Sequence, residues 1–409
     1  MKRVILIMLL VAAFLSLYGQ SQITIKGRII DKKSGDAVSF AHVGLCEKAI
    51  GTVSNVNGEF ELKLPQYYPR DTLCISAIGY KTYKNLPEKL KDIHPLIVEM
   101  QPETSVLQDV LILDEAITGK RVLEKAINRI SRNYSSRPYQ LEGYYRDYLK
   151  KNNEYISFLE AAITVQDMGI NTQESKSRIR INQLRFSDNY EENYYKYLHK
   201  DEEDTLKEIL EGESAFYWGN EFSNMRYHNP IRNRLESVPF LGVFDNFYQS
   251  SYQFNIGYYT YVDEEEVYVI NFKPNEMYKY HHVQADGEIY IRVRDYAILK
   301  FNYHFYVTKF GDKKKWYELN VEYRDYQNMM FLKYISYVNY FKIYTGFEIS
   351  ELYQYREYFV TDIHYPDFET IPKSENIDKS VPLHAHEAPN ELEFWVDYNV
   401  ILLEKPLKE

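Results

Sequence analysis

Apolar and polar residues alternate through most of this chain, which is the period-two pattern of strands with one buried face. The clearest run follows Asn57-Gly58. Three apolar residues there alternate with three charged ones, namely Phe60, Leu62 and Leu64 with Glu59, Glu61 and Lys63. An Asn-Gly pair favours a type I′ turn, because both central residues of that turn need a positive φ. We therefore predict a β-hairpin over residues 51–64.

Similar short runs, separated by turn residues, occupy the rest of residues 22–100. The predicted inward positions are Ala41, Val43, Leu45, Leu73, Ile75, Leu96, Val98 and Met100. Ser34-Gly35 and the stretch 65–71 supply the turn chemistry between runs. Strands at this spacing predict a β-sandwich.

The next part of the chain mixes helical and strand patterns. Thr118 is a candidate N-cap for a helix ending near Asn133, because apolar residues recur there on one stripe. Residues 139–150 and 154–166 predict a hairpin around Asn152-Asn153, and 179–186 predict another strand. We expect an acidic helix over 201–210 and loops with short turns over 213–249.

From Tyr252 to Val360 the pattern predicts an antiparallel meander. Its runs are 252–262, 267–273, 288–294, 297–307, 315–326, 331–344 and 347–360. Asp286-Gly287 and Gly311-Asp312 are the predicted turns. The pattern leaves open whether this sheet is open, a half-barrel or a closed barrel. Prolines break the tail from Pro366 to Pro389, and residues 393–399 are expected to dock its end.

Composition supports a large amount of sheet. The 409 residues include 41 tyrosines, and tyrosine suits a half-buried strand surface because its ring is apolar and its hydroxyl is polar. The net charge is −10, which disfavours nucleic acid as a partner and disfavours docking on an anionic lipid surface by charge alone.

The first residues predict export from the cytoplasm. Lys2-Arg3 precede an apolar run from Val4 to Leu17, and small and polar residues follow. This is the pattern of a secretory signal peptide, here residues 1–21. We find no later apolar run long enough for a transmembrane helix. The expected location is the periplasm or the periphery of the outer membrane.

Cys46 and Cys74 are the two cysteines of the chain. An exported protein can pair them. Strand alternation places both opposite the predicted core residues, so the sequence leaves open whether they form a disulfide or are two small apolar residues.

Four motifs in residues 25–81 resemble the carboxypeptidase-like regulatory domain. They are Ile25-x-Gly27-x-Ile29-x-Asp31, Ala41-x-Val43, Gly51-Thr52-Val53-Ser54 with Asn57-Gly58-x-Phe60-x-Leu62, and Ile78-Gly79-Tyr80-Lys81. The resemblance implies a seven-stranded transthyretin-like sandwich of exported proteins of the Bacteroidetes type, including TonB-dependent receptors. That domain is generally non-catalytic, so it implies no site residues.

The remainder carries weaker resemblances. Residues 107–112 resemble the segment that leads into the plug and barrel of TonB-dependent receptors, but only about 300 residues remain, too few for a 22-stranded transporter. Residues 143–147 and 159–162 resemble an uncharacterised family of Bacteroidetes envelope proteins. Residues 287–291 and 295–300 resemble the periplasmic lipoprotein-carrier fold, in which a curved sheet surrounds an apolar cavity.

Histidines supply the candidate metal ligands. His199-x-x-Glu202 with His304 would be needed for a zinc peptidase, and His384 with His386 could share one face of an extended segment. His281-His282 is a weaker pair. Since metal sites need three or four convergent ligands, and no phosphate loop, nucleophile elbow or redox cysteine pair occurs, we predict no catalytic, cofactor-binding or metal-binding residues.

These observations predict a mainly β protein with some helix. The expected parts are a signal peptide (1–21), an immunoglobulin- or transthyretin-like sandwich (22–100), a linker (101–117), a tyrosine-rich α+β domain with a large meander (118–365) and a proline-broken tail (366–409). The expected function is a non-enzymatic binding or scaffold role in the cell envelope, with a protein, glycan or lipid as partner. A lipid or lipoprotein carrier and a zinc carboxypeptidase are the alternatives.

Overall fold

The computed structural model describes residues 22–46, 48–65, 68, 70–105, 117–198, 220–234, 249–262, 264–278, 281–309, 312–345 and 348–404. The predicted signal peptide, the predicted helix over 201–210 and the His199/Glu202 motif lie outside these residues, as does most of the predicted linker. The chain divides into two compact units. The first is Met1–Ala77, Lys81–Pro102 and Leu392–Pro406, and the second is Ile78–Tyr80, Glu103–Glu391 and Leu407–Glu409.

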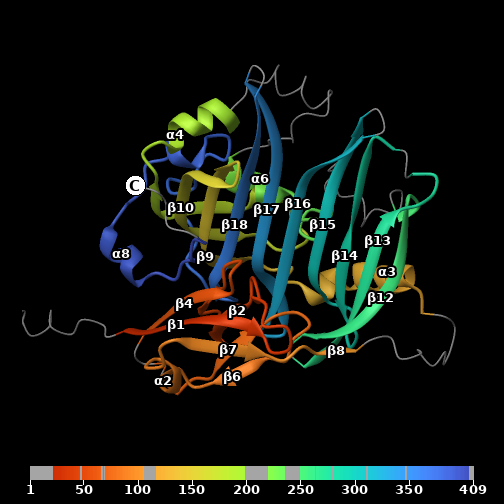
Figure 1. Ribbon diagram of the computed structural model, residues 1–409, viewed down its shortest axis with the longest axis horizontal. Coiled ribbons are helices and arrows are strands. Elements are labelled where there is room, and N and C mark those ends of the chain that lie inside the picture. Colours follow the sequence, from red (N-terminus) through yellow and green to blue (C-terminus); the bar gives the residue numbers. More distant parts are fainter. Residues whose placement is uncertain are drawn as a thin grey trace, which may run out of the picture. The chain divides into compact units, whose positions relative to one another are not determined.

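The first unit is a sandwich of two small sheets (Figure 1). Its elements are β1 (Gln22–Asp31), β2 (His42–Leu45), β3 (Gly51–Val53), β4 (Glu59–Pro65), β5 (Leu73–Ser76), β6 (Tyr83–Asn85), α2 (Pro87–Leu90), β7 (Leu96–Met100) and α8 (Leu392–Asp397). One sheet has the order β4-β1-β7 and the other β3-β2-β5-β6. All the inward positions predicted from alternation are buried, so the predicted seven-stranded sandwich is confirmed.

The predicted hairpin over residues 51–64 is wrong. β3 pairs with β2, whereas β4 pairs with β1 in the other sheet. Gly58 has a φ of 76° but Asn57 does not have a positive φ, so the turn is not type I′. The Asn55 side chain instead accepts hydrogen bonds from the backbone N–H groups of Asn57 and Glu59, and the Gly58 carbonyl accepts one from Ile29. The turn therefore carries the chain from one sheet to the other.

The C-terminal segment completes this first unit. The Asn399 side chain accepts a hydrogen bond from the Lys63 backbone N–H at 2.8 Å and donates one to the Lys63 carbonyl at 3.0 Å. These two bonds pair the backbone N–H and carbonyl of Lys63 on the outer edge of β4, as the backbone of a neighbouring strand would. On the other sheet, the Thr52 hydroxyl donates to the carbonyl of Val400. Trp395 and Ile401 are buried, so the end of the predicted tail packs as part of the sandwich.

Cys46 and Cys74 form a disulfide with a Cα–Cα distance of 5.0 Å and a sequence separation of 28. Cys74 lies on β5, and the Cys46 backbone N–H donates to the carbonyl of Thr72. The bond thus joins the end of β2 to the adjacent strand, and it settles the pairing that the sequence left open.

The second unit is built on one eleven-stranded antiparallel sheet in the described residues (Figure 1). Its strands are β8 (Thr104–Ser105), β9 (Tyr139–Lys151), β10 (Glu154–Asp167), β11 (Arg178–Phe186), β12 (Tyr252–Val262), β13 (Glu265–Pro274), β14 (Val283–Arg292), β15 (Ile298–Lys309), β16 (Asp312–Tyr326), β17 (Met329–Thr345) and β18 (Glu348–His364). The order is β11-β10-β9-β18-β17-β16-β15-β14-β13-β12-β8. With β11 and β8 at its two edges, the sheet is open, and the mainly β fold class is confirmed.

The hairpin predicted around Asn152-Asn153 is confirmed, because both residues have a positive φ and β9 pairs with β10. The turn predicted at Asp286-Gly287 is wrong. Gly287 lies inside β14, where a Cβ atom would approach the Asn302 carbonyl oxygen to 2.1 Å. Glycine is needed there because the neighbouring strand comes so close, and the chain turns later, before β15.

Short helices cover parts of the large sheet. They are α3 (Gly119–Asn133), η1 (Glu174–Lys176), α4 (Tyr190–Asn193), η2 (Tyr194–Leu198), α6 (Glu221–Tyr227) and η4 (Leu383–Ala385). Thr118 caps α3 as predicted, accepting from the backbone N–H of Arg121. Loops were expected across 213–249, but α6 forms within that stretch, where Asn220 caps it and Phe222 and Met225 are buried.

Among the described residues, no helix is both long enough and apolar enough to cross a lipid bilayer.

Candidate functional site

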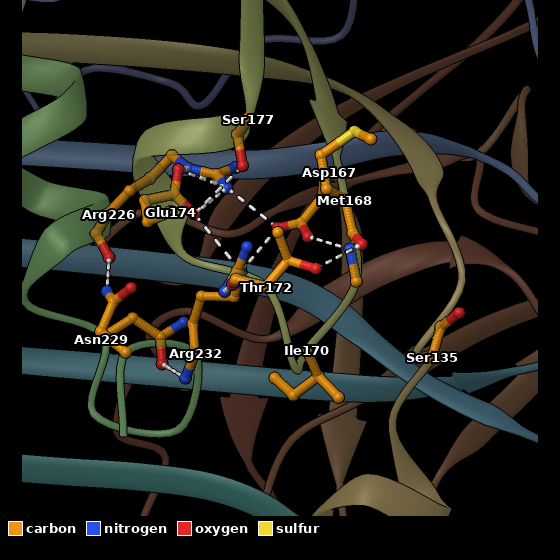
Figure 2. Close-up of polar contacts among 12 residues, drawn as sticks. Ser135, Asp167, Met168, Ile170, Thr172, Glu174, Ser177, Arg226, Asn229 and Arg232 are labelled. Atoms are coloured by element: carbon orange, nitrogen blue, oxygen red, sulfur yellow. Dashed lines mark hydrogen bonds and ion pairs between the residues drawn. The ribbon is translucent and has the colours of Figure 1, made fainter. Parts of the chain in front are cut away.

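Four charged residues meet where β10 ends against α6 (Figure 2). Asp167 is the last residue of β10, Glu174 begins η1, Arg226 lies in α6 and Arg232 follows in the next turn. We call these four residues the charge cluster. Local hydrogen bonds place them, since Asp167 accepts from the backbone N–H of Gly169 at 2.8 Å. The side chain of Asn229 likewise accepts from the backbone of Arg232 and fixes its turn.

The guanidinium of Arg226 donates two hydrogen bonds of 2.9 Å to Glu174, from Nε to Oε1 and from Nη2 to Oε2. Its Nη2 also donates to Oδ2 of Asp167 at 3.2 Å, and Nε of Arg232 donates to the same oxygen at 2.8 Å. All four side chains are at most 8% exposed. The charge cluster therefore ties three separate chain segments together in the interior.

Contacts within the charge cluster shift the pKa values of Asp167 and Arg226 toward their ionised forms. Burial alone would raise the pKa of Asp167, but the guanidinium groups of Arg232 and Arg226 hold that pKa below its ordinary value. Burial would likewise lower the pKa of Arg226, and Glu174 raises it instead. No proton is poised to move near neutral pH at Asp167 or Arg226, so the arrangement suits a structural or ion-binding role better than acid–base catalysis.

A second buried carboxyl group titrates close to neutral pH. Burial is the main cause that raises the pKa of Asp147 on β9 to about 7, although Arg356 opposes it. The Gln354 side chain donates to both Asp147 oxygens, at 2.9 and 3.1 Å, and the Arg356 Nε lies 3.7 Å away. Because Asp147 is 1% exposed, a substrate has no direct access to this carboxyl group.

His228, directly after α6, is held neutral inside the same unit. Its Nδ1 lies 2.8 Å from the Asn224 carbonyl and its Nε2 lies 3.4 Å from the Tyr337 hydroxyl. Burial lowers the pKa of His228 to about 4. The folded protein therefore binds fewer protons here than the unfolded chain between about pH 6.5 and pH 4.

We expect His228→Gln to reduce the acid sensitivity of the protein. Neutral His228 makes its full contribution to the free energy of unfolding above pH 6.5, and this contribution is lost as pH falls toward 4. The loss reaches about 3 kcal/mol, because each pKa unit corresponds to about 1.4 kcal/mol. The measurement is the free energy of unfolding in urea at several pH values, compared as variant minus wild type. The matched control is His386→Gln, at a histidine that is only half-buried. Equal pH slopes for His228→Gln and wild type would contradict the neutral assignment.

The opposite face of the sheet carries tyrosine rings between charged side chains. We call it the tyrosine face, and its residues on β14 to β18 are Asp286, His304, Tyr306, Lys313, Lys315, Glu318, Tyr340, Tyr353 and Tyr355. The strands that carry these residues lie side by side (Figure 1). Along each strand, residues of the tyrosine face alternate with buried residues such as Tyr303 and Phe305. The charged side chains are between 33% and 43% exposed.

Contacts within the tyrosine face hold its rings in place. The Lys313 ammonium lies 3.7 Å from the centre of the Tyr306 ring and 3.3 Å from Asp286. The rings of Tyr340 and Tyr353 meet edge to face with centres 5.5 Å apart. Such contacts reduce the entropy that a ligand must remove when it binds, so these rings form a preorganised surface.

The histidines considered from sequence have separate surroundings. His304 lies 3.2 Å from Asp286 and 3.7 Å from Glu318. The ring of His384 packs 4.7 Å from that of Tyr194, whereas His386 is half-buried with Nε2 beside the Asp378 carbonyl. In the described part of the chain, no group of three or more histidine, cysteine, aspartate or glutamate side chains is arranged to hold a metal ion.

Residues 25–112 match the family model described as the CarboxypepD_reg-like domain. The TonB-dependent receptor SusC of Bacteroides thetaiotaomicron is 30% identical over 110 residues, which are 27% of this chain and 10% of the receptor. The chain thus spans about a tenth of the length of this curated relative. The resemblance of the N-terminal sandwich to the carboxypeptidase-like regulatory domain is confirmed.

Two solved structures show a weak overall similarity. A DUF1329 family protein from Desulfovibrio piger is 8% identical, with a TM-score of 0.26 over 62% of this chain and 96% of that chain. Lipovitellin, described through its lipid–protein interactions, is 9% identical, with a TM-score of 0.21 over 60% of this chain and 27% of that chain. At these scores neither similarity carries an inference.

Proposed function

We propose that this chain is a non-catalytic glycan-binding protein of the cell envelope that contacts its ligand through the tyrosine face. The observation that carries the proposal is the row of half-exposed tyrosine rings fixed between lysines and carboxylates on adjacent strands. A sugar presents apolar C–H surfaces and many hydroxyl groups. The rings offer flat apolar area with polar tips, and the charged neighbours offer strong hydrogen-bonding partners for hydroxyl groups.

Charge favours a neutral ligand over an acidic one. Among the lysines and carboxylates of the tyrosine face, Lys313 and Lys315 contribute +2 and Asp286 and Glu318 contribute −2, which gives zero. A surface that binds phosphate backbones or anionic lipid needs an excess of positive charge. The tyrosine face lacks that excess, so an uncharged glycan fits it better.

The alternatives gain less support. A lipid carrier needs a cavity that can enclose an acyl chain, and the cavity beside the charge cluster offers only about 20 Å³ to the centre of a water-sized sphere, little more than one water needs. A zinc peptidase needs three convergent protein ligands, and the described residues contain no group of three or more His, Cys, Asp or Glu side chains arranged to hold a metal ion.

Location in the envelope is part of the proposal. Its supports are the CarboxypepD_reg-like domain and the similarity to a TonB-dependent receptor, together with the basic and apolar pattern of residues 2–17. Mass spectrometry of the protein recovered from the periplasm or outer membrane should find a mature N-terminus between Gly19 and Gln22. Recovery of the uncleaved chain from the cytoplasm would contradict export.

Removing two rings from the tyrosine face should weaken glycan binding. We expect Tyr306→Ala with Tyr340→Ala to lower affinity for the bound polysaccharide at least tenfold, since a stacked ring contributes about 1–3 kcal/mol to recognition of a planar ligand face. The measurement is affinity electrophoresis against a panel of neutral polysaccharides, followed by calorimetry on the best ligand.

The matched control is Tyr261→Ala with Tyr296→Ala, which removes two tyrosines outside the tyrosine face. This control should bind as wild type does, and circular dichroism should show both double variants folded. Equal affinity of the face variant and wild type would contradict the glycan role. Release of reducing sugar ends from the bound polysaccharide would contradict the non-catalytic assignment.

A further inference from the structure

A small cavity lies beside the charge cluster, between the large sheet and the residues that follow α6. Tyr139, Arg226 and Arg232 contribute to its lining. The space open to the centre of a water-sized sphere is about 20 Å³, and a single water needs roughly 10–15 Å³ by this measure. The cavity is therefore large enough for a monatomic ion or a very small molecule.

Two charged donors next to this cavity have no hydrogen-bond partner in the protein. They are Nη1 of Arg226 and Nη2 of Arg232, both fully buried atoms on side chains that are 5% exposed. Burying a charged donor without a partner is costly. Burial and the nearby Asp167 hold the pKa of Tyr139 far above its ordinary value, so its hydroxyl stays protonated and can also donate.

Positive charge exceeds negative charge around the cavity. The charged side chains in its lining are Arg226, Arg232 and Asp167, so 2 − 1 leaves +1. The Arg234 Nη1 donates at 2.7 Å to the carbonyl of Ile170, which lines the cavity. The Lys379 ammonium donates at 3.1 Å to the carbonyl of Glu174. The lining therefore carries more positive than negative charge.

We propose that this cavity is a binding site for one small monovalent anion, with chloride as the model ligand. Arg226 Nη1, Arg232 Nη2 and the Tyr139 hydroxyl are the donors. Charge-assisted hydrogen bonds from guanidinium groups are stronger than neutral ones, and an anion here offsets the excess positive charge of the cavity lining. The anion thereby joins β9, α6 and the following turn, and its role is structural.

Thermal unfolding of the full chain at fixed ionic strength tests this site. Sodium chloride replaces sodium gluconate, whose anion is too large for the cavity. We expect the midpoint to rise saturably with chloride and with bromide, as it does when a ligand binds only the folded state. Tyr139→Phe should raise the apparent Kd for chloride at least fivefold. Arg180→Gln, which alters an exposed arginine paired with Glu375, should leave that Kd unchanged.

Two further measurements make the outcome decisive. Crystals grown in bromide should show an anomalous peak within hydrogen-bond distance of Arg226 and Arg232. Chloride-35 linewidths of the wild-type protein should show competition by bromide, which tests the site even where Tyr139→Phe does not fold. An equal midpoint in chloride and gluconate, or a bromide crystal without the peak, would overturn the proposal.

Discussion

Replacing Arg226 by methionine is expected to lower the free energy of unfolding of the second unit by about 3–5 kcal/mol. Breaking a buried ion pair by removing one partner has that cost, because the other charge stays buried without compensation. Here Glu174 would lose its two 2.9 Å hydrogen bonds and keep Arg232 at 3.3 Å, and Asp167 would keep only one of its two guanidinium neighbours.

Urea unfolding followed by tryptophan fluorescence measures this effect. In a Trp395→Phe background the remaining tryptophans fall in the second unit, and Trp316 is a buried reporter. The matched control is Arg180→Met, which breaks an ion pair with Glu375 whose side chains are 35% and 45% exposed. Exposed ion pairs contribute about 0–1 kcal/mol to stability, so Arg180→Met should leave the free energy of unfolding nearly unchanged.

A second substitution separates charge from packing in the charge cluster. Glu174→Gln neutralises a carboxylate whose two hydrogen bonds from Arg226 are lost in Arg226→Met, so adding it to that variant should recover part of the lost stability. Glu174→Gln could instead lower the free energy of unfolding by the same amount in the Arg226→Met background as in the wild-type protein. Equal losses would show that the two residues act independently. That result would contradict the paired arrangement of Figure 2.

Removing the disulfide should destabilise the first unit by about 3–4 kcal/mol. The bond joins residues separated by 28 positions, and closing a loop of that length removes about this much entropy from the unfolded chain in the loop-closure description. We expect the effect in Cys46→Ser with Cys74→Ser, measured by urea unfolding with Trp395 as the reporter of the first unit.

Reduction of the wild-type protein by dithiothreitol is the control for the double serine variant. Both should lower the urea midpoint equally, because both remove the same cross-link and leave the sheets unchanged. An unchanged midpoint after complete reduction, verified by thiol alkylation, would show that the cross-link adds nothing to the stability of the sandwich.

Local turn chemistry predicted where the chain bends better than it predicted which strands pair. Asn152-Asn153 and Asn57-Gly58 give the same hairpin signal, yet only the first joins paired strands. The difference is tertiary, because Gly58 is bonded to Ile29 of β1 while β3 pairs with β2. The alternation of apolar and polar residues was a more reliable guide to which residues are buried, because it depends directly on burial. The buried faces of the strands in the first unit follow this alternation.

The charge cluster was not predicted, although one signal for it exists in the sequence. Asp167 continues the inward alternation of Ile163 and Val165 on β10, so it places a carboxylate at a core position. An inward charge of this kind requires a buried partner. Its partner Arg226 lies 59 positions later, in a stretch without clear period, so sequence alone could not identify which cation meets it.

The contact between Lys63 and Asn399 makes the assembly of the sandwich a long-range event. These residues lie 336 positions apart, whereas the disulfide spans 28. Closing the longer loop costs roughly 2 kcal/mol more chain entropy. High contact order slows folding, and the outer edge of β4 stays unpaired until the last part of the chain has been synthesised. During that interval, the edge is a template for pairing with other extended chains.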